Sequence, residues 1–216
     1  ITLASGENIL WSAVIDTSNG FAYFGTDTSP GKVVKIRFQN IISSGNSSFW
    51  NLTLNNSVGN WLFTTASDIN NDLTITAGSL TAPSTNLTIS GNWSNSGTFT
   101  HSSGTVTFDD SEKTTTFSGS TTFYNLTSNT VSKNLTFTAG TTQSIASGGT
   151  LTLNGQSCTT YIVLRSSSSP NQWNIDVASG ATANISYVNV KDSNARVSAI
   201  VASNSKDSDN NTNWTV

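Results

Sequence analysis

Residues 72–78 read Asp-Leu-Thr-Ile-Thr-Ala-Gly, and residues 134–140 read Asn-Leu-Thr-Phe-Thr-Ala-Gly. In both stretches large apolar side chains alternate with threonine, and successive side chains of a strand point to opposite faces. Each stretch therefore predicts a strand with an apolar face toward a core and a threonine face outward. The final glycine, Gly78 or Gly140, tolerates a positive φ and predicts a corner where the chain turns.

These two stretches belong to a longer internal repeat. Residues 49–53 (FWNLT) match residues 123–127 (FYNLT), and residues 87–92 (LTISGN) match residues 151–156 (LTLNGQ), in the same order. Repetition of short strands predicts a solenoid, in which each coil stacks on the one before. The region also resembles the parallel β-helix repeats of microbial adhesins, including a tail rich in Asn and Thr that runs into Trp214.

The first 40 residues have a different pattern. Three β-like runs, at residues 11–16, 20–25 and 32–38, are separated by segments rich in turn-forming residues. They predict a three-stranded β-meander. Residues 13–38 (AVIDTSNGFAYFGTDTSPGKVVKIRF) resemble one β-propeller-type repeat of secreted microbial surface proteins. The resemblance implies most of one propeller blade, and one copy cannot close a propeller.

The sequence thus predicts an all-β protein in two parts. A short β-meander over residues 1–40, which could link subunits, precedes a parallel β-helix, or β-solenoid, over residues 41–216. A β-sandwich remains the alternative for the second part, because sandwich strands also alternate in polarity and recur between turn signals.

Composition supports an all-β chain and excludes some partners. The 216 residues include 36 Ser, 34 Thr and 26 Asn, whereas charged residues make up only 10%. Ser and Asn disfavour helices through local hydrogen bonds, and Thr favours strands. The net charge of −3 provides no basic field for nucleic acid. No apolar run reaches the roughly 18 residues of a membrane span, so we expect neither nucleic acid nor a membrane span.

Other features predict an extracellular, secreted glycoprotein of the cell surface. The chain has no Met, so Ile1 is not an initiator: the chain is either cleaved, as from an exported precursor, or a piece of a longer product. Its single cysteine, Cys158, cannot form an internal disulfide and is expected to be buried as a small apolar side chain. Asn-x-Ser/Thr sequons supply candidate glycosylation sites. They begin at Asn46, Asn51, Asn55, Asn86, Asn92, Asn125, Asn134, Asn184, Asn210 and Asn213.

Residues that could carry out catalysis are few. His101 is the only histidine, and a strand or turn position explains it better than a catalytic triad. Asp109 and Asp110 could form the carboxylate pair of a glycoside hydrolase. A turn in which Lys113 pairs with these acids explains them better. We therefore expect no enzyme, no catalytic residue and no required cofactor.

The tail contains one weak metal candidate. Asp207, Asp209, Asn211 and Asn213 alternate like the first oxygen ligands of a calcium loop. The glycine expected at the sixth position of such a loop is Thr212, and the sequence ends before a twelfth position. Calcium is therefore the only cofactor that the sequence suggests, and only weakly.

The function predicted from the sequence is structural. A solenoid leaves open strand edges at both ends, and such edges pair with other strands unless they are capped. We expect copies to join as a homopolymer, either a filament or a surface layer, through β-strand contacts. Candidate contact residues are Ile1, Leu3, Ile9 and Leu10. One alternative is a monomeric adhesin module that binds surface glycans; a carbohydrate-active β-helix enzyme is a less favoured one.

Overall fold

The alternating pattern produces strands and no long helix in the part of the chain that the structure describes. A computed structural model describes residues 10–16, 21–26, 33–37, 40–43 and 47–216. Strands β1 (Leu10–Asp16), β2 (Phe21–Thr26) and β3 (Val33–Arg37) pair antiparallel in that order, which confirms the predicted meander. Within the described ranges, no helix has the length and apolar character that crossing a membrane requires.

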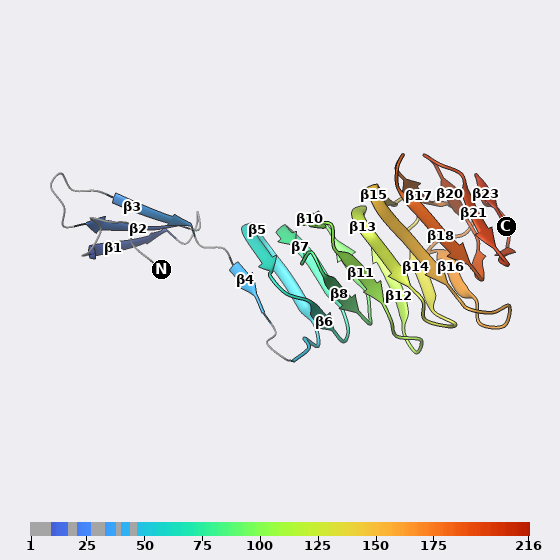
Figure 1. Ribbon diagram of the computed structural model, residues 1–216, viewed down its shortest axis with the longest axis horizontal. Coiled ribbons are helices and arrows are strands. Elements are labelled where there is room, and N and C mark those ends of the chain that lie inside the picture. The colour runs from blue at the N-terminus through green and yellow to red at the C-terminus, as the bar shows by residue number, and fades with distance from the viewer. Residues whose placement is uncertain (1–9, 17–20, 27–32, 38–39, 44–46) are drawn as a thin grey trace.

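The rest of the described chain forms two sheets, which we call sheet I and sheet II (Figure 1). Sheet I has the order β22 (Lys206–Asp207), β19 (Val188–Val190), β16 (Ile162–Ser166), β14 (Asn134–Phe137), β12 (Thr114–Ser118), β9 (Trp93–Asn95), β7 (Leu73–Thr81), β5 (Leu52–Phe63), β4 (Asn40–Ile42), and β10 (Thr98–Thr100) pairs with β7. Sheet II has the order β23 (Trp214–Thr215), β21 (Ile200–Ser203), β18 (Thr182–Ser186), β15 (Thr142–Asn154), β13 (Thr121–Ser128), β11 (Thr105–Phe108), β8 (Asn86–Ile89), β6 (Ser67–Ile69), with β17 (Trp173–Val177) beside β15 and β20 (Ser193–Ala195) beside β17.

Every strand pair within these two sheets is parallel, and the chain passes back and forth between the sheets as it advances. This arrangement is a parallel β-helix, which confirms the solenoid and excludes the antiparallel pairing of the sandwich alternative. The repeated stretches lie in β7 and β14. Gly78 and Gly140 have φ angles of +83° and +76°, as predicted. However, β7 continues past Gly78 to Thr81, so this glycine lies inside a strand.

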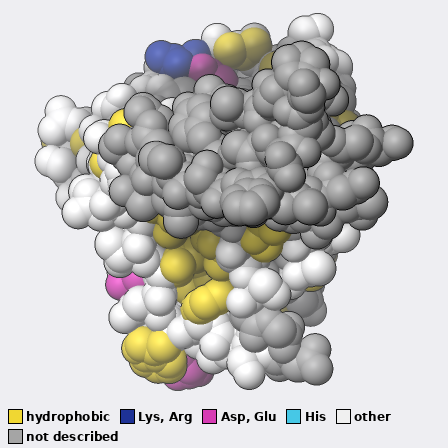
Figure 2. All heavy atoms as spheres, turned by 90° about the vertical axis from the view of Figure 1, so that its left-hand side faces the viewer, with side chains coloured by type: hydrophobic (Ala, Val, Ile, Leu, Met, Phe, Trp, Pro, Cys, Tyr) yellow, Lys and Arg dark blue, Asp and Glu magenta, His cyan; other side chains and the backbone are white. Residues whose placement is uncertain are grey.

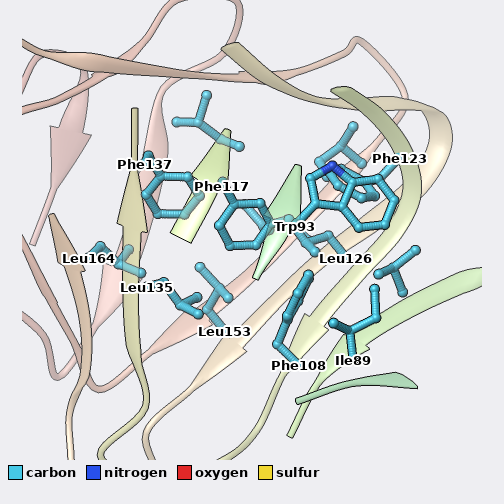
Figure 3. Packing of buried hydrophobic residues seen from close by; sticks show 14 of the residues in the cluster. Ile89, Trp93, Phe108, Phe117, Phe123, Leu126, Leu135, Phe137, Leu153 and Leu164 are labelled. Atoms are coloured by element: carbon cyan, nitrogen blue, oxygen red, sulfur yellow. The ribbon is translucent and has the colours of Figure 1, made fainter. Parts of the chain in front are cut away.

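Inward-facing apolar side chains form one continuous core between the sheets (Figure 3). Leu73, Trp93, Phe117 and Phe137 occupy the same register position in successive strands of sheet I. The rings of Phe117 and Phe137 stack with centroids 4.7 Å apart, and Trp173 stacks on Phe137 at 3.8 Å. Burying such large rings supplies much of the apolar stabilisation of a chain with only 35% apolar residues.

Candidate functional site

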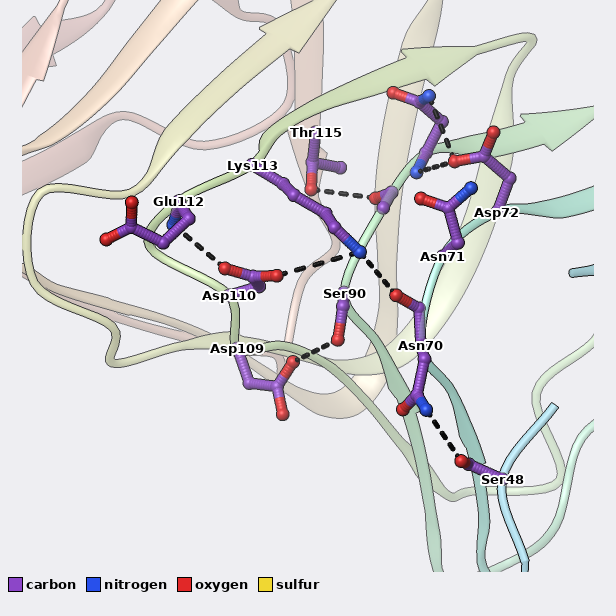
Figure 4. Close-up of polar contacts among 12 residues, drawn as sticks. Ser48, Asn70, Asn71, Asp72, Ser90, Asp109, Asp110, Glu112, Lys113 and Thr115 are labelled. Atoms are coloured by element: carbon purple, nitrogen blue, oxygen red, sulfur yellow. Dashed lines mark hydrogen bonds and ion pairs between the residues drawn. The ribbon is translucent and has the colours of Figure 1, made fainter. Parts of the chain in front are cut away.

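The connections from sheet II to sheet I stack into one corner, which we call the lysine corner (residues 70–72, 90–92, 109–113 and 129–133). Figure 4 shows the polar contacts around Lys113 in this corner. Lys133 directly precedes β14, and its side chain is 0% exposed. Its Nζ donates to the backbone oxygens of Asp110 at 2.6 Å and Lys113 at 2.9 Å. A longer contact of 3.4 Å joins it to the backbone oxygen of Ser90. Because an ammonium group has three donors, one lysine ties its own coil to the two preceding coils.

A second lysine makes the same kind of contact one coil earlier. Lys113 Nζ donates to the backbone oxygen of Asn70 at 2.5 Å. It lies 3.7 Å from Asp110 Oδ2 and 5.1 Å from the centroid of the Trp50 ring. Burial lowers the pKa of Lys133 from 10.5 to about 8, although the nearby charges of Asp110 and Asp109 act in the opposite direction. The corner is thus a structural junction with a perturbed amine.

The acids that could suggest glycoside hydrolysis take part in the hydrogen bonding of this corner. Asp110 Oδ1 accepts the backbone N–H of Glu112 at 2.8 Å, and its other oxygen faces Lys113. Asp109 Oδ1 accepts the Ser90 hydroxyl at 3.1 Å. Burial and the charge of Asp109 raise the pKa of Asp68. The structure therefore places the predicted acidic turn between β11 and β12, with its carboxylates bonded to their own turn and to the adjacent coil.

The calcium candidates close the last coil. Asp207 Oδ1 accepts the Asp209 N–H at 2.8 Å and the Asn211 side-chain amide at 2.6 Å. Asn211 Oδ1 accepts the Ser193 N–H, and Asn213 Nδ2 donates to the backbone oxygen of Ala195. In the described chain, no group of three His, Cys, Asp or Glu residues gathers as metal ligands. Asp209 Oδ1 accepts the N–H of the next residue, Asn210, and the other three side chains bond to one another, to the Asp209 backbone or to the preceding coil. A calcium role stays a prediction.

His101 and Cys158 both lie in connections between strands. His101 Nδ1 accepts the Ser103 N–H at 3.1 Å, within the turn between β10 and β11. Cys158 is exposed, so the expectation that it is buried was wrong. The reason is its location: residues 155–161 connect β15 to β16 outside the alternating pattern that turns side chains inward.

An open groove of about 540 Å³ lies over β5 and β7. Its lining is mostly small polar side chains and glycine, including Asn60, Thr76, Ser79 and Thr98. Ser79 donates its hydroxyl to Asn60 across the two strands. The groove thus offers hydroxyl and amide groups on a concave surface, which is a chemistry that suits the hydroxyl groups of a sugar.

Most of the exposed large apolar side chains among residues 40–43 and 47–216 lie at the two ends of the solenoid. In these two ranges seven such side chains are exposed: Ile41, Trp50 and Val58 at the N-terminal end, Val131 in the middle, and Val197, Val201 and Val216 at the C-terminal end. Figure 2 faces the N-terminal end and shows apolar side chains there in yellow. The exposed fraction reaches 60% at Ile41 and 62% at Val201, against 38% at Val131.

The outermost strands at these ends are incompletely paired. β4 pairs only with residues 61–63 of β5, so residues 52–60 have no strand on that side within the described chain. At the opposite end, β22 and β23 each have two residues. The predicted contact residues Ile1, Leu3 and Ile9 lie outside the described residues. Leu10 begins β1 and pairs with Thr26.

The sequons follow from the strand pattern itself. Asn-Leu-Thr places Asn and Thr outward and Leu inward, so a strand of this solenoid readily contains a sequon. Examples are Asn86 in β8, Asn125 in β13 and Asn134 in β14. Nine of the ten predicted sequon asparagines are described, and Asn46 lies outside the described residues.

Comparison with protein-family models, with curated proteins and with solved structures found no match for this chain. The two parallel sheets establish the fold as a β-solenoid. The resemblance to adhesin and propeller repeats remains a hypothesis. The site residue that sequence reasoning missed is Lys133. A signal was present: Lys113 and Lys133 are 20 residues apart, and each directly precedes a strand of sheet I.

Proposed function

We propose that this chain is an extracellular structural protein whose copies join end to end through parallel β-strand contacts, as subunits of a surface filament or layer. The observation that supports it most is the location of exposed apolar side chains. Six of the seven in residues 40–43 and 47–216 lie at the two ends of the solenoid, beside strands with incomplete pairing. Open edges with apolar surroundings pair with other strands.

The geometry of the two ends suits a head-to-tail contact. Both sheets are parallel throughout, so a second copy can continue sheet I in the same direction by placing its β5 edge beside β22. Such a contact joins unlike surfaces and leaves both outer ends free, which gives an open filament. The low charge of the chain, 10% of residues, adds little repulsion between copies.

The test is the size distribution of the full chain over a range of concentrations, by sedimentation velocity and negative-stain electron microscopy. A lysine on an edge strand opposes pairing. Ile41→Lys places a lysine on the edge strand β4, and Val201→Lys replaces an exposed apolar side chain of β21, the neighbour of the edge strand β23. Each should lower the polymerised fraction at least tenfold at a fixed concentration. Val131→Lys is the matched control, since Val131 is exposed in the middle, and it should polymerise like the parent chain. A parent chain that stays monomeric at every concentration contradicts the proposal.

A second candidate function is glycan binding, which the polar groove over β5 and β7 favours. Binding to immobilised polysaccharides without polymer formation supports this function in place of assembly. Asn60→Ala should then weaken binding, because it removes an amide from the groove lining. Thr127→Ala, on the outward face of sheet II, is the control that should leave binding unchanged.

A further inference from the structure

The described sequon asparagines fall into two classes according to the contacts of their side-chain amides. Six amides make hydrogen bonds within the protein. In five of them Nδ2 is the donor: to Thr88 from Asn86, to Asp72 from Asn92, to Thr105 from Asn125, to Pro170 and Asp192 from Asn210, and to Ala195 from Asn213. Asn51 differs, because only its Oδ1 is bonded: it accepts the Asn71 side-chain amide and the Asp72 N–H. These amides therefore help to hold adjacent coils or the closing turn together.

The three remaining asparagines differ in both exposure and bonding. Asn55, Asn134 and Asn184 are all exposed, and no side-chain hydrogen bond of theirs occurs among the described residues. Asn134 belongs to sheet I, whereas Asn184 belongs to sheet II. Asn55 lies in β5 where the register with β7 shifts, which places it outside the regular ladder.

This difference matters for N-glycosylation because the sugar is joined to the amide nitrogen, Nδ2. An Nδ2 that donates to a neighbouring coil points along the surface or inward, and a bulky sugar on it would displace its partner. Asn92 illustrates the problem: its Nδ2 donates to Asp72 Oδ1 at 3.0 Å, and its Oδ1 accepts the Thr116 N–H at 2.9 Å. An exposed amide without such bonds can carry a sugar directed into solvent.

We propose that Asn55, Asn134 and Asn184 are N-glycosylation sites of the folded protein, and that the five sequon asparagines whose Nδ2 is hydrogen-bonded have a structural role instead. The modification is an N-linked oligosaccharide. The proposal rests on export of the chain, which is part of the proposed function, but it does not depend on end-to-end assembly.

The test is glycopeptide mass spectrometry of the full chain after secretion from a cell with an N-glycosylation pathway. Folded, secreted protein should carry sugar at Asn55, Asn134 and Asn184, with little at the five sequons whose Nδ2 is hydrogen-bonded. Predominant occupancy of Asn92 or Asn125 in folded protein, or unmodified protein throughout, overturns the proposal. Failure here leaves the assembly test unaffected, because that test measures polymer size on the same chain with or without sugar.

Variants separate a modified asparagine from a structural one. Asn55→Gln, Asn134→Gln and Asn184→Gln should each remove one oligosaccharide from the intact mass and leave the thermal midpoint of the enzymatically deglycosylated protein nearly unchanged. Asn92→Gln, in the connection that directly precedes β9 of sheet I, is the matched control. It should leave the attached mass unchanged and lower the midpoint, because two hydrogen bonds to adjacent coils are disrupted. The opposite pattern contradicts the assignment.

Discussion

Two corners of the solenoid hold adjacent coils together by different contacts. At the lysine corner, Lys133 and Lys113 insert ammonium groups among backbone oxygens of adjacent coils. At the opposite corner, where β12 leads into β13, Gly119 has no side chain, and an added Cβ would lie 2.0 Å from the Asn95 oxygen. The buried amide of Gln143 donates to the Gly119 oxygen at 2.9 Å. One corner therefore depends on a long cation, and the other on the close approach of two backbones.

The glycine corner should be the less tolerant of the two. Gly119→Ala should lower the free energy of unfolding by about 3–5 kcal/mol, because it combines a positive φ of +80° with a backbone clash. Urea unfolding measures this change. Gly140→Ala is the matched control: Gly140 has a φ of +76° but no atom within 4 Å of an added Cβ. It should cost only about 1–2 kcal/mol, and equal losses would mean that close approach contributes nothing.

The lysine corner should respond to pH, whereas the glycine corner should not. The pKa of Lys133 is about 8 in the folded protein and 10.5 when exposed, so the unfolded chain binds more protons between these values. Stability from this group therefore rises as pH increases from 8 to 10.5, by at most about 3 kcal/mol. The measurement is urea unfolding of the parent chain and of Lys133→Met at several pH values. A stability difference that stays constant across this range contradicts the buried ammonium.

The contact between Lys113 of the lysine corner and Trp50 should contribute least to stability. Trp50 is 65% exposed, and its ring faces Lys113 Nζ. Trp50→Ala should lower the free energy of unfolding by about 0.5–1 kcal/mol, the usual range for an exposed cation–π pair. A double-mutant cycle with Lys113→Met isolates that pair, and Trp50→Phe should retain part of the effect. Strict additivity of the two single changes would show that the ring and the ammonium do not interact.

The parts of this structure that the sequence predicted are those with a local signal. Alternation in residues 72–78 predicted β7, because side-chain direction in a strand depends only on position parity. The sandwich alternative stayed open because strand direction relative to a neighbour is set by distant residues. Pairing of Leu73 with Leu52 and Trp93, both about 20 residues away, decides it.

The site was harder to predict than the fold, for a different reason. A lysine such as Lys133 is ordinarily a surface residue, and only the stacking of three coils surrounds it with backbone oxygens. Cys158 was misassigned because composition describes the average cysteine, whereas its exposure follows from one connection between β15 and β16. The contacts that divide the sequons likewise arise only when residues of separate coils come together.

The unequal pairing of the coils has a mechanical consequence. The backbone ladders of the two sheets join each coil only to its neighbours, so a pull along the solenoid axis loads all coil interfaces with the same force. β13 and β15 share seven paired positions, whereas β21 and β23 share two. Under tension the chain should therefore yield first at its C-terminal coil and extend by peeling from that end, while the central coils stay intact.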